Sequence, residues 1–258
     1  MLISLTRVFY CTYVDQENNE IKVFNADEAI RFFKAQAQSW GLHCKIEKSA
    51  RIVAKAMVNN DKAQLLINKD AVFTEKEVHA FAYHELGIHM LTTINAKQHP
   101  LKVFSLGLTG NTHTQEGLAL YSEYCSGSLT IERLRIIALR VIAVKYMLEH
   151  NDFVKTYHTL MNEFKLEKDI AFTLTTRVYR GGGFTKDYLY LKGFRDIISL
   201  SKSTSIDNLL VGKAGLLDFE VTNELVERGM ISRPKPLFDL SYKSSGDLVL
   251  DFIVNSIK

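Results

Sequence analysis

The sequence has few cysteines and prolines, and it has no clean apolar run of membrane-spanning length. Its three cysteines, Cys11, Cys44 and Cys125, are far apart and form no C-x-x-C pair. This spacing argues against a disulfide framework and against a cysteine zinc cage. The longest apolar region, residues 134–148, is interrupted by Arg140 and a later lysine, so it falls short of the roughly 20 clean residues that a membrane span needs. We therefore expect a buried amphipathic helix there and no membrane partner.

Neither the charge nor the N-terminus indicates nucleic-acid binding or secretion. The net charge of +3 is spread over many residues without a dense basic run, so we expect no nucleic-acid partner. The N-terminal stretch has Arg7 inside its apolar part and lacks a basic leader followed by a small-residue cleavage site, so it does not read as a signal peptide. Together with the cysteine usage, these features predict a cytoplasmic protein, and they leave its oligomeric state open.

Strand patterns precede helical patterns along the chain. The β-branched and aromatic residues at 2–14, a polar turn and the short run 21–24 predict a hairpin, and strands at 50–58 and 62–68 predict a second one. A helix that starts at a capping box of Asn25 and Glu28 separates the two hairpins and ends near Gly41. Further helices are predicted at about 75–95, 115–125, 131–149, 152–164, 167–179, 187–200 and 216–229.

These patterns predict an α+β fold that is mainly helical, in a single domain over residues 1–258. Residues 1–72 form a sheet-rich N-terminal part, in which we expect a small antiparallel sheet, and residues 73–258 form a helical part. We expect the sheet to pack against the first helix of the helical part, which carries the most informative motif of the chain.

That motif is the segment FTEKEVHAFAYHELGIHML at 73–91. Thr74 and Glu77 form a second capping box, so a helix is expected to begin at Glu75. About ten residues later this helix carries two histidines and a glutamate, the residue types that a catalytic zinc site uses as ligands and base. The pattern H-E-x-x-x-H predicts that His84 and His89 bind the metal and that Glu85 acts as the catalytic base.

The spacing of the two histidines requires a distorted helix. Five residues on a regular α-helix turn about 500°, which leaves the two imidazoles roughly 140° apart. A π-type turn places residues i and i+5 on one face, and Gly87 between the histidines would ease that distortion. We therefore predict a bulge at 84–89. The alternative is a regular helix with two ordinary, partly buried histidines and a solvated Glu85.

A catalytic zinc site needs a third protein ligand, and the segment NTHTQEGLALYSEYC at 111–125 supplies a candidate. Glu116 lies near the start of a predicted helix, and Gly117 beside it would allow another backbone to approach closely. Glu123, seven residues later on the same face, is either a rival ligand or a partner for one of the imidazoles. His113 is a weaker candidate.

Four segments in order resemble the QEGLA-motif family, which includes the microtubule-associated tyrosine carboxypeptidases. They are HELGIH at 84–89, QEGLALYSE at 115–123, RVYRGGG at 177–183 and FTKDYLYLKG at 184–193. The resemblance runs from about residue 52 to about 240, and it does not extend to the first fifty residues or the tail.

The resemblance implies a zincin-like, mainly helical fold and a zinc-dependent peptidase. It also implies that one Zn²⁺ per chain is bound by His84, His89 and Glu116. Eukaryotic members of the family remove a C-terminal tyrosine from tubulin, whereas microbial members are often described only by the motif. The family therefore does not fix the substrate of this chain.

A carboxypeptidase also needs a cation for the terminal carboxylate of its substrate. Arg177, Arg180 and Lys186 are the candidates, and the glycines at 181–183 would let a peptide end approach. Tyr179, Tyr188 and Tyr190 could line an aromatic pocket or donate to the oxyanion. The alternative is that an arginine at a helix end followed by glycines simply caps the helix.

These observations predict a zinc metallopeptidase whose substrate is the C-terminus of a peptide or protein. It would be a carboxypeptidase that removes one C-terminal residue, with tyrosine as a candidate for that residue. An endopeptidase with the same metal site is the nearest variant. The alternative from another class is a zincin-like protein that binds metal or a partner for regulation and hydrolyses nothing.

Overall fold

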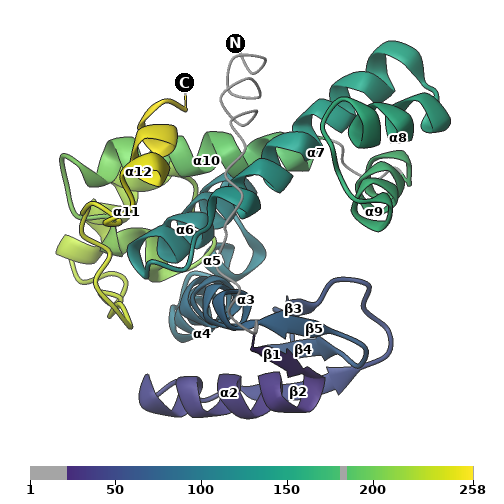
Figure 1. Cartoon of the computed structure of the whole chain (residues 1–258). Coiled ribbons are helices and arrows are strands. Elements are labelled where there is room, and N and C mark those ends of the chain that lie inside the picture. Colours follow the sequence, from purple (N-terminus) through teal and green to yellow (C-terminus); the bar gives the residue numbers. More distant parts are fainter. Residues whose placement is uncertain (1–21, 181–184, 258) are drawn as a thin grey trace.

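A computed structural model of the chain describes residues 22–180 and 185–257, and these form two small sheets followed by helices (Figure 1). The first strand of the N-terminal hairpin that we predicted and the glycines at 181–183 lie outside the described residues. The described part is mainly helical with small sheets, as predicted. None of its helices is long and apolar enough to span a membrane.

The strands form one two-stranded and one three-stranded sheet. β1 (Val23–Asn25) pairs with β5 (Val72–Thr74) in antiparallel fashion. The larger sheet has the order β2-β4-β3, with bounds Lys45–Ser49, Gln64–Asn68 and Ala56–Asn59. β3 and β4 form the antiparallel hairpin that the sequence predicts.

β2 departs from the expected antiparallel sheet, because it runs parallel to β4. The chain passes from β2 at one edge of this sheet to β3 at the other edge, and it then returns along the centre as β4. Leu65 and Ile67 of β4 are fully buried. Tertiary packing therefore decides which strand pairs with β2, and the alternation of apolar residues in the sequence does not predict this pairing.

Both predicted capping boxes start helices, α2 (Ala26–Ser39) and α3 (Glu75–Phe81). At the second box the Glu77 N–H donates to Thr74 Oγ1 at 3.2 Å, and the Thr74 N–H donates to Glu77 Oε2 at 2.9 Å. α3 continues without interruption into the π-helix η1 (Ala82–Met90) and then into α4 (Leu91–Gln98). The predicted distortion is therefore confirmed, and it occupies nine residues.

The helix α3-η1-α4 lies between the sheets and the later helices (Figure 1). Its π-helical part contacts β3 and β4 on one side and α6 on the other. The later elements are α5 (Val103–Leu106), α6 (Asn111–Cys125), α7 (Ile131–His150), α8 (Phe153–Asn162), α9 (Lys168–Tyr179), α10 (Thr185–Ser201), η2 (Asp207–Val211), η3 (Leu216–Asp218), α11 (Phe219–Glu227) and α12 (Leu248–Asn255). Each helix that the sequence predicts has a counterpart among them, whereas α5, η2 and α12 were not predicted.

Two larger hydrophobic cores and a third, which joins α4, α5, η2 and α11, hold the described helices. The main core joins the sheets to η1, α6, the first half of α7 and α10. A smaller core joins the second half of α7 to α8 and α9, and Figure 1 shows this helical group set apart from the sheets, beyond the end of α7. The two cores therefore meet along α7, which passes beside the functional site described below.

α6 and α10 cross with their backbones in contact. A Cβ atom added to Gly117 of α6 would overlap the backbone of Gly193 on α10, and one added to Gly193 would overlap the carbonyl oxygen of His113. The close approach that the sequence predicts at Gly117 therefore exists, and its partner is α10. This crossing fixes the distance between the side chains of α10 and the adjacent Glu116.

Candidate metal centre

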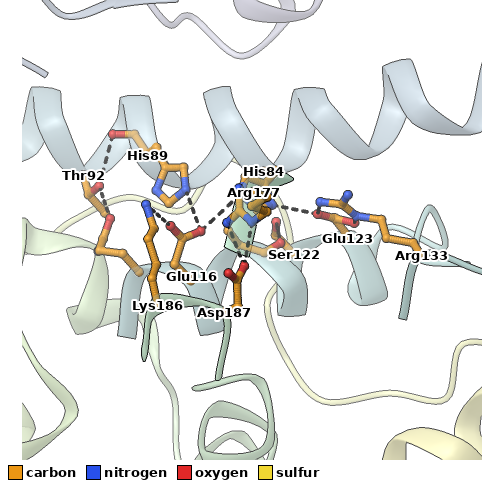
Figure 2. A network of polar contacts seen from close by, with 12 residues as sticks. His84, His89, Thr92, Glu116, Ser122, Glu123, Arg133, Arg177, Lys186 and Asp187 are labelled. Carbon is orange, nitrogen blue, oxygen red and sulfur yellow. Dashed lines mark hydrogen bonds and ion pairs between the residues drawn. The ribbon is translucent and has the colours of Figure 1, made fainter. Parts of the chain in front are cut away.

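His84 and His89 from η1 and Glu116 from α6 converge on one point (Figure 2). The Nε2 atoms of both histidines lie 3.6 Å from Glu116 Oε2. The two rings have their centroids 4.9 Å apart and are inclined by 78°. One ligand atom from each of the three residues lies within 4.8 Å of the others. The π-helix thus brings together two imidazoles that a regular helix would separate.

The three side chains fit a metal ion. Glu116 Oε2 is buried, and no described residue hydrogen-bonds to it. A buried carboxylate oxygen without a donor is costly unless another group satisfies it. Two imidazole nitrogens and one carboxylate oxygen are the ligands of a known class of catalytic zinc site. The cluster of His84, His89 and Glu116 could therefore hold a metal ion.

Negative charge surrounds the imidazoles. Burial opposes the positive charge of His84, but the carboxylates of Glu116 and Glu123, and to a smaller extent Glu85, raise its pKa to about 9. Burial likewise opposes the negative charge of Glu116, but the two imidazoles hold the pKa of this carboxyl well below its usual value. The centre is therefore built to stabilise a positive charge, which a metal ion would supply.

Glu123 orients one of the two imidazoles. His84 Nδ1 lies 2.7 Å from Glu123 Oε1, and Glu123 is fully buried. Arg133 from α7 holds the same carboxylate, with Nη2 2.6 Å from Oε1 and with Nε bound to Oε2. An ionised carboxylate only accepts hydrogen bonds, so Nδ1 of His84 donates to Glu123, and Nε2 is the nitrogen that faces the cluster. Of the two roles that the sequence left open for Glu123, the contacts match that of an imidazole partner.

Glu85, the residue after the first histidine, is also buried. The π-helix therefore carries two metal-type ligands and an adjacent carboxylate within one continuous segment. This placement leaves Glu85 close to the cluster without being part of the set of three converging ligand atoms.

Two of the residues predicted to bind substrate lie beside the cluster (Figure 2). Lys186 Nζ is 3.5 Å from Glu116 Oε1, and its side chain is 52% exposed. Arg177 donates to Asp187 Oδ1 from Nε at 2.8 Å and approaches it with Nη2 at 2.7 Å. Asp187 itself is buried. Tyr190 is near as well. Burial is the main cause that raises the pKa of its hydroxyl, and the negative charge of the nearby Glu116 is the second.

The other three predicted substrate residues have different surroundings. The Tyr179 hydroxyl is 3.0 Å from Thr156 Oγ1, and its ring packs against Phe153. Arg180 is exposed, and its backbone N–H bonds to Thr176, so it follows the helix-cap alternative. Tyr188 is 47% exposed, and the nearest cation to its ring is Lys192. None of these contacts joins Tyr179, Arg180 or Tyr188 to the metal cluster.

Three residues near the centre were not predicted from the sequence, namely Arg133, Arg140 and Asp187. A signal for the two arginines was present, because they stand seven positions apart on a largely apolar helix. Residues seven apart share one helix face. A pair of charges on one face of a buried helix indicates a polar site next to it. For Asp187 we find no comparable signal.

Comparison with known proteins adds one family. The sequence model of the microtubule-associated tyrosine carboxypeptidase family matches residues 5–257. The match covers the converging residues, and it extends over the N-terminal region and the tail, which the four motifs left out. No curated protein matches the chain significantly.

Proposed function

We propose a function from the premise that this chain belongs to the microtubule-associated tyrosine carboxypeptidase family. The chain is a zinc-dependent carboxypeptidase with a zincin-like catalytic domain, and it removes one C-terminal residue from a peptide or protein. Tyrosine is the first candidate for the residue removed. The observation that carries the proposal is the convergence of His84, His89 and Glu116 around a buried carboxylate oxygen that has no hydrogen-bond donor among the described residues.

His84, His89 and Glu116 would hold one Zn²⁺ per chain. When bound, zinc supplies a Lewis acid for the scissile carbonyl and lowers the pKa of a water molecule toward about 7. Glu123 keeps the Nδ1 proton of His84, so that Nε2 stays free to act as a ligand. Arg133 in turn keeps Glu123 ionised, because burial raises the pKa of Glu123 but the charges of Arg133 and His84 lower it overall.

The proton transfer falls to Glu85. Its carboxylate accepts a proton from the attacking water while the new C–O bond forms at the scissile carbonyl. It then delivers this proton to the leaving amine nitrogen as the C–N bond breaks. The terminal carboxylate of the substrate needs a cation, and Arg177 and Lys186 stand on the side of the cluster where such a carboxylate would lie.

Peptides that differ only at their C-terminus test this proposal. Zinc-loaded protein is incubated with a peptide that ends in a free carboxylate, with its amidated twin and with variants of the last residue, and the products are identified by mass spectrometry. We expect loss of one residue from the free peptide and no cleavage of the amide. Equal cleavage of both would support the endopeptidase instead, and an uncleaved peptide library would support the non-catalytic protein.

The Glu85→Gln protein, purified in the same way, is the matched control for contaminating peptidases. We place the enzyme in the cytoplasm, because the described cysteines Cys44 and Cys125 are free thiols and form no disulfide. Fractionation of cells that express the full chain would test this location.

A further inference from the structure

Arg140 on α7 is a partly buried arginine that has no carboxylate partner among the described residues. Its Nε atom is buried and has no hydrogen-bond partner there. A guanidinium stays charged at neutral pH, and a buried charge without a partner is costly. Binding of an anion beside Arg140 would therefore offset the cost of its unpaired charge.

The groups around Arg140 belong to the metal centre. Burial, together with the nearby positive charge of Arg177, lowers the pKa of Arg140 to about 10, while Tyr190 and Asp187 act in the opposite direction. Arg177 and Asp187 lie beside Glu116 (Figure 2), and the charge of Glu116 also acts on Tyr190. α7 packs against both α9 and α10, which carry these residues, so Arg140 lies near the same group.

Two of the three arginines in this region are paired with a carboxylate, and the third is not. Arg133 is paired with Glu123, and Arg177 is paired with Asp187. The third guanidinium, Arg140, has no carboxylate of its own within residues 22–180 and 185–257. Both bonds from Arg177 to Asp187 end on the single oxygen Oδ1. Of these three guanidiniums, Arg140 is the one that lacks a carboxylate partner among the described residues.

We propose that Arg140 binds the terminal carboxylate of the peptide substrate, with Arg177 beside it. This inference rests on the proposed carboxypeptidase activity and assigns the residue that recognises the free C-terminus. A guanidinium binds a carboxylate through two parallel N–H donors, which a neutral amide cannot match. Asp187 holds Arg177 in place, and Arg140 supplies the charge that no described side chain neutralises. Lys186, at the exposed rim, helps to attract the anion.

Peptide binding to the inactive Glu85→Gln protein tests this assignment without turnover. In zinc-loaded Glu85→Gln protein we expect a free-carboxylate peptide to bind at least about tenfold more tightly than its amidated twin, as measured by fluorescence anisotropy. Adding Arg140→Gln is expected to abolish this difference and to leave the affinity for the amide unchanged. Lys145→Gln, which removes one positive charge from the exposed side of the same helix, is the matched control and should keep the difference.

Two further variants separate recognition from folding. Arg140→Met removes the buried charge, so the metal-free protein should be as stable as the parent protein or more stable. A large loss of stability would instead indicate a structural role and overturn the assignment. Arg140→Lys keeps the charge but not the paired donors, so its preference for the free carboxylate should be intermediate.

The outcomes distinguish this inference from the proposed function. If the unmutated enzyme cleaves amidated and free peptides equally, the carboxypeptidase proposal fails. If it discriminates between them and Arg140→Gln discriminates equally well, only the assignment of Arg140 fails. An amidated peptide with a glutamate as its last residue supplies the third arm. If Arg140→Gln weakens binding of this peptide instead, Arg140 recognises an acidic side chain and the assignment is wrong.

Discussion

Two groups of charged residues border the cluster of His84, His89 and Glu116, and they differ in how far their positive charges are paired with carboxylates. In the first group, which we call the ligand flank, the partly buried Arg133 pairs with the buried Glu123, which contacts His84. In the second group, which we call the cation flank, Arg177 pairs with Asp187 and Lys186 lies near Glu116, whereas Arg140 has no carboxylate partner among the described residues. The ligand flank is complete by itself, whereas the cation flank carries more positive charge than its carboxylates neutralise.

The two flanks show that position, and not residue type, decides what an arginine does here. Arg133 and Arg140 lie on one face of the same helix, seven residues apart. Arg133 meets the carboxylate of α6, whereas the neighbours of Arg140 on α9 and α10 include a second arginine. The pair of Arg133 and Glu123 orients His84. Arg140, which has no carboxylate partner among the described residues, is available to bind an incoming anion.

The largest effect on activity is expected at Glu85, which belongs to neither flank. Glu85→Gln removes the proposed proton acceptor and keeps the shape of the side chain, so kcat should fall by about 10²–10⁴. Zinc content should stay at one ion per chain, because Glu85 is outside the converging set. Peptidase assays and metal analysis of the same preparation provide the measurement. A parallel loss of zinc would place Glu85 among the ligands and would contradict this division of roles.

Breaking the ligand flank should weaken metal binding before anything else. Glu123→Gln removes the ionised acceptor of the His84 Nδ1 proton, so zinc affinity should fall by about 10–100-fold. It also leaves Arg133 buried without its counterion, which costs about 3–5 kcal/mol of stability. Competition with a chelator and thermal unfolding measure the two effects. Glu132→Gln is the control, because this glutamate is exposed on α7 and pairs only with Arg135. Unchanged zinc affinity in Glu123→Gln would show that the ligand flank does not support the metal.

A change at the crossing of α6 and α10 should disturb both flanks together. Gly193→Ala places a methyl group against the carbonyl oxygen of His113, where it overlaps. Such overpacking lowers the free energy of unfolding by about 1–3 kcal/mol. α10 would shift away from Glu116 and take Asp187 and Tyr190 with it. Denaturant unfolding reports the loss of stability, and peptide affinity reports the displacement. The neighbouring Lys192→Ala serves as the control. A stable Gly193→Ala protein with normal activity would show that the crossing is not what sets this distance.

The smallest effect is expected at a site remote from both flanks. Asp251 at the start of α12 accepts a hydrogen bond from the Tyr124 hydroxyl at 2.8 Å and another from the Ser245 N–H at 3.0 Å. Burial alone would raise its pKa, but bonds from Ser244, Ser245 and Tyr124 lower it to about 2. Asp251→Asn should cost about 1 kcal/mol at neutral pH, with zinc affinity unchanged.

The pH dependence of this effect has a definite sign. A carboxyl with a depressed pKa stabilises the fold above its ordinary value of 3.8 and loses this contribution as the pH falls toward 2. Thermal unfolding of the original chain should therefore depend more steeply on pH between about 4 and 2 than that of Asp251→Asn. Asp251→Asn with an equally steep acid transition would assign the transition to other carboxyls.

Local patterns predicted much of the fold and of the candidate centre. Both capping boxes start helices where the sequence places them, since each depends only on residues three positions apart. The π-helix followed from one chemical requirement, that two imidazoles five positions apart share one ion. The parallel pairing of β2 was missed, because it depends on the route of the chain around β4. Arg140 was interpreted as an interruption of an apolar helix, because its surroundings come from α9 and α10. α12 was missed as well, and its contact with Tyr124 is equally remote in the sequence.

The wide helix of η1 also matters for how such proteins are detected and related. A π-helical turn holds one residue more than an α-helical turn, so η1 accommodates an additional residue between the two histidines while α3 and α4 continue on either side. A search pattern that demands histidines four apart will pass over this helix even though the two rings converge. Aligning η1 with a zinc helix of the shorter spacing requires a one-residue gap between His84 and His89, and a gap outside this interval would bring the wrong side chain to the metal.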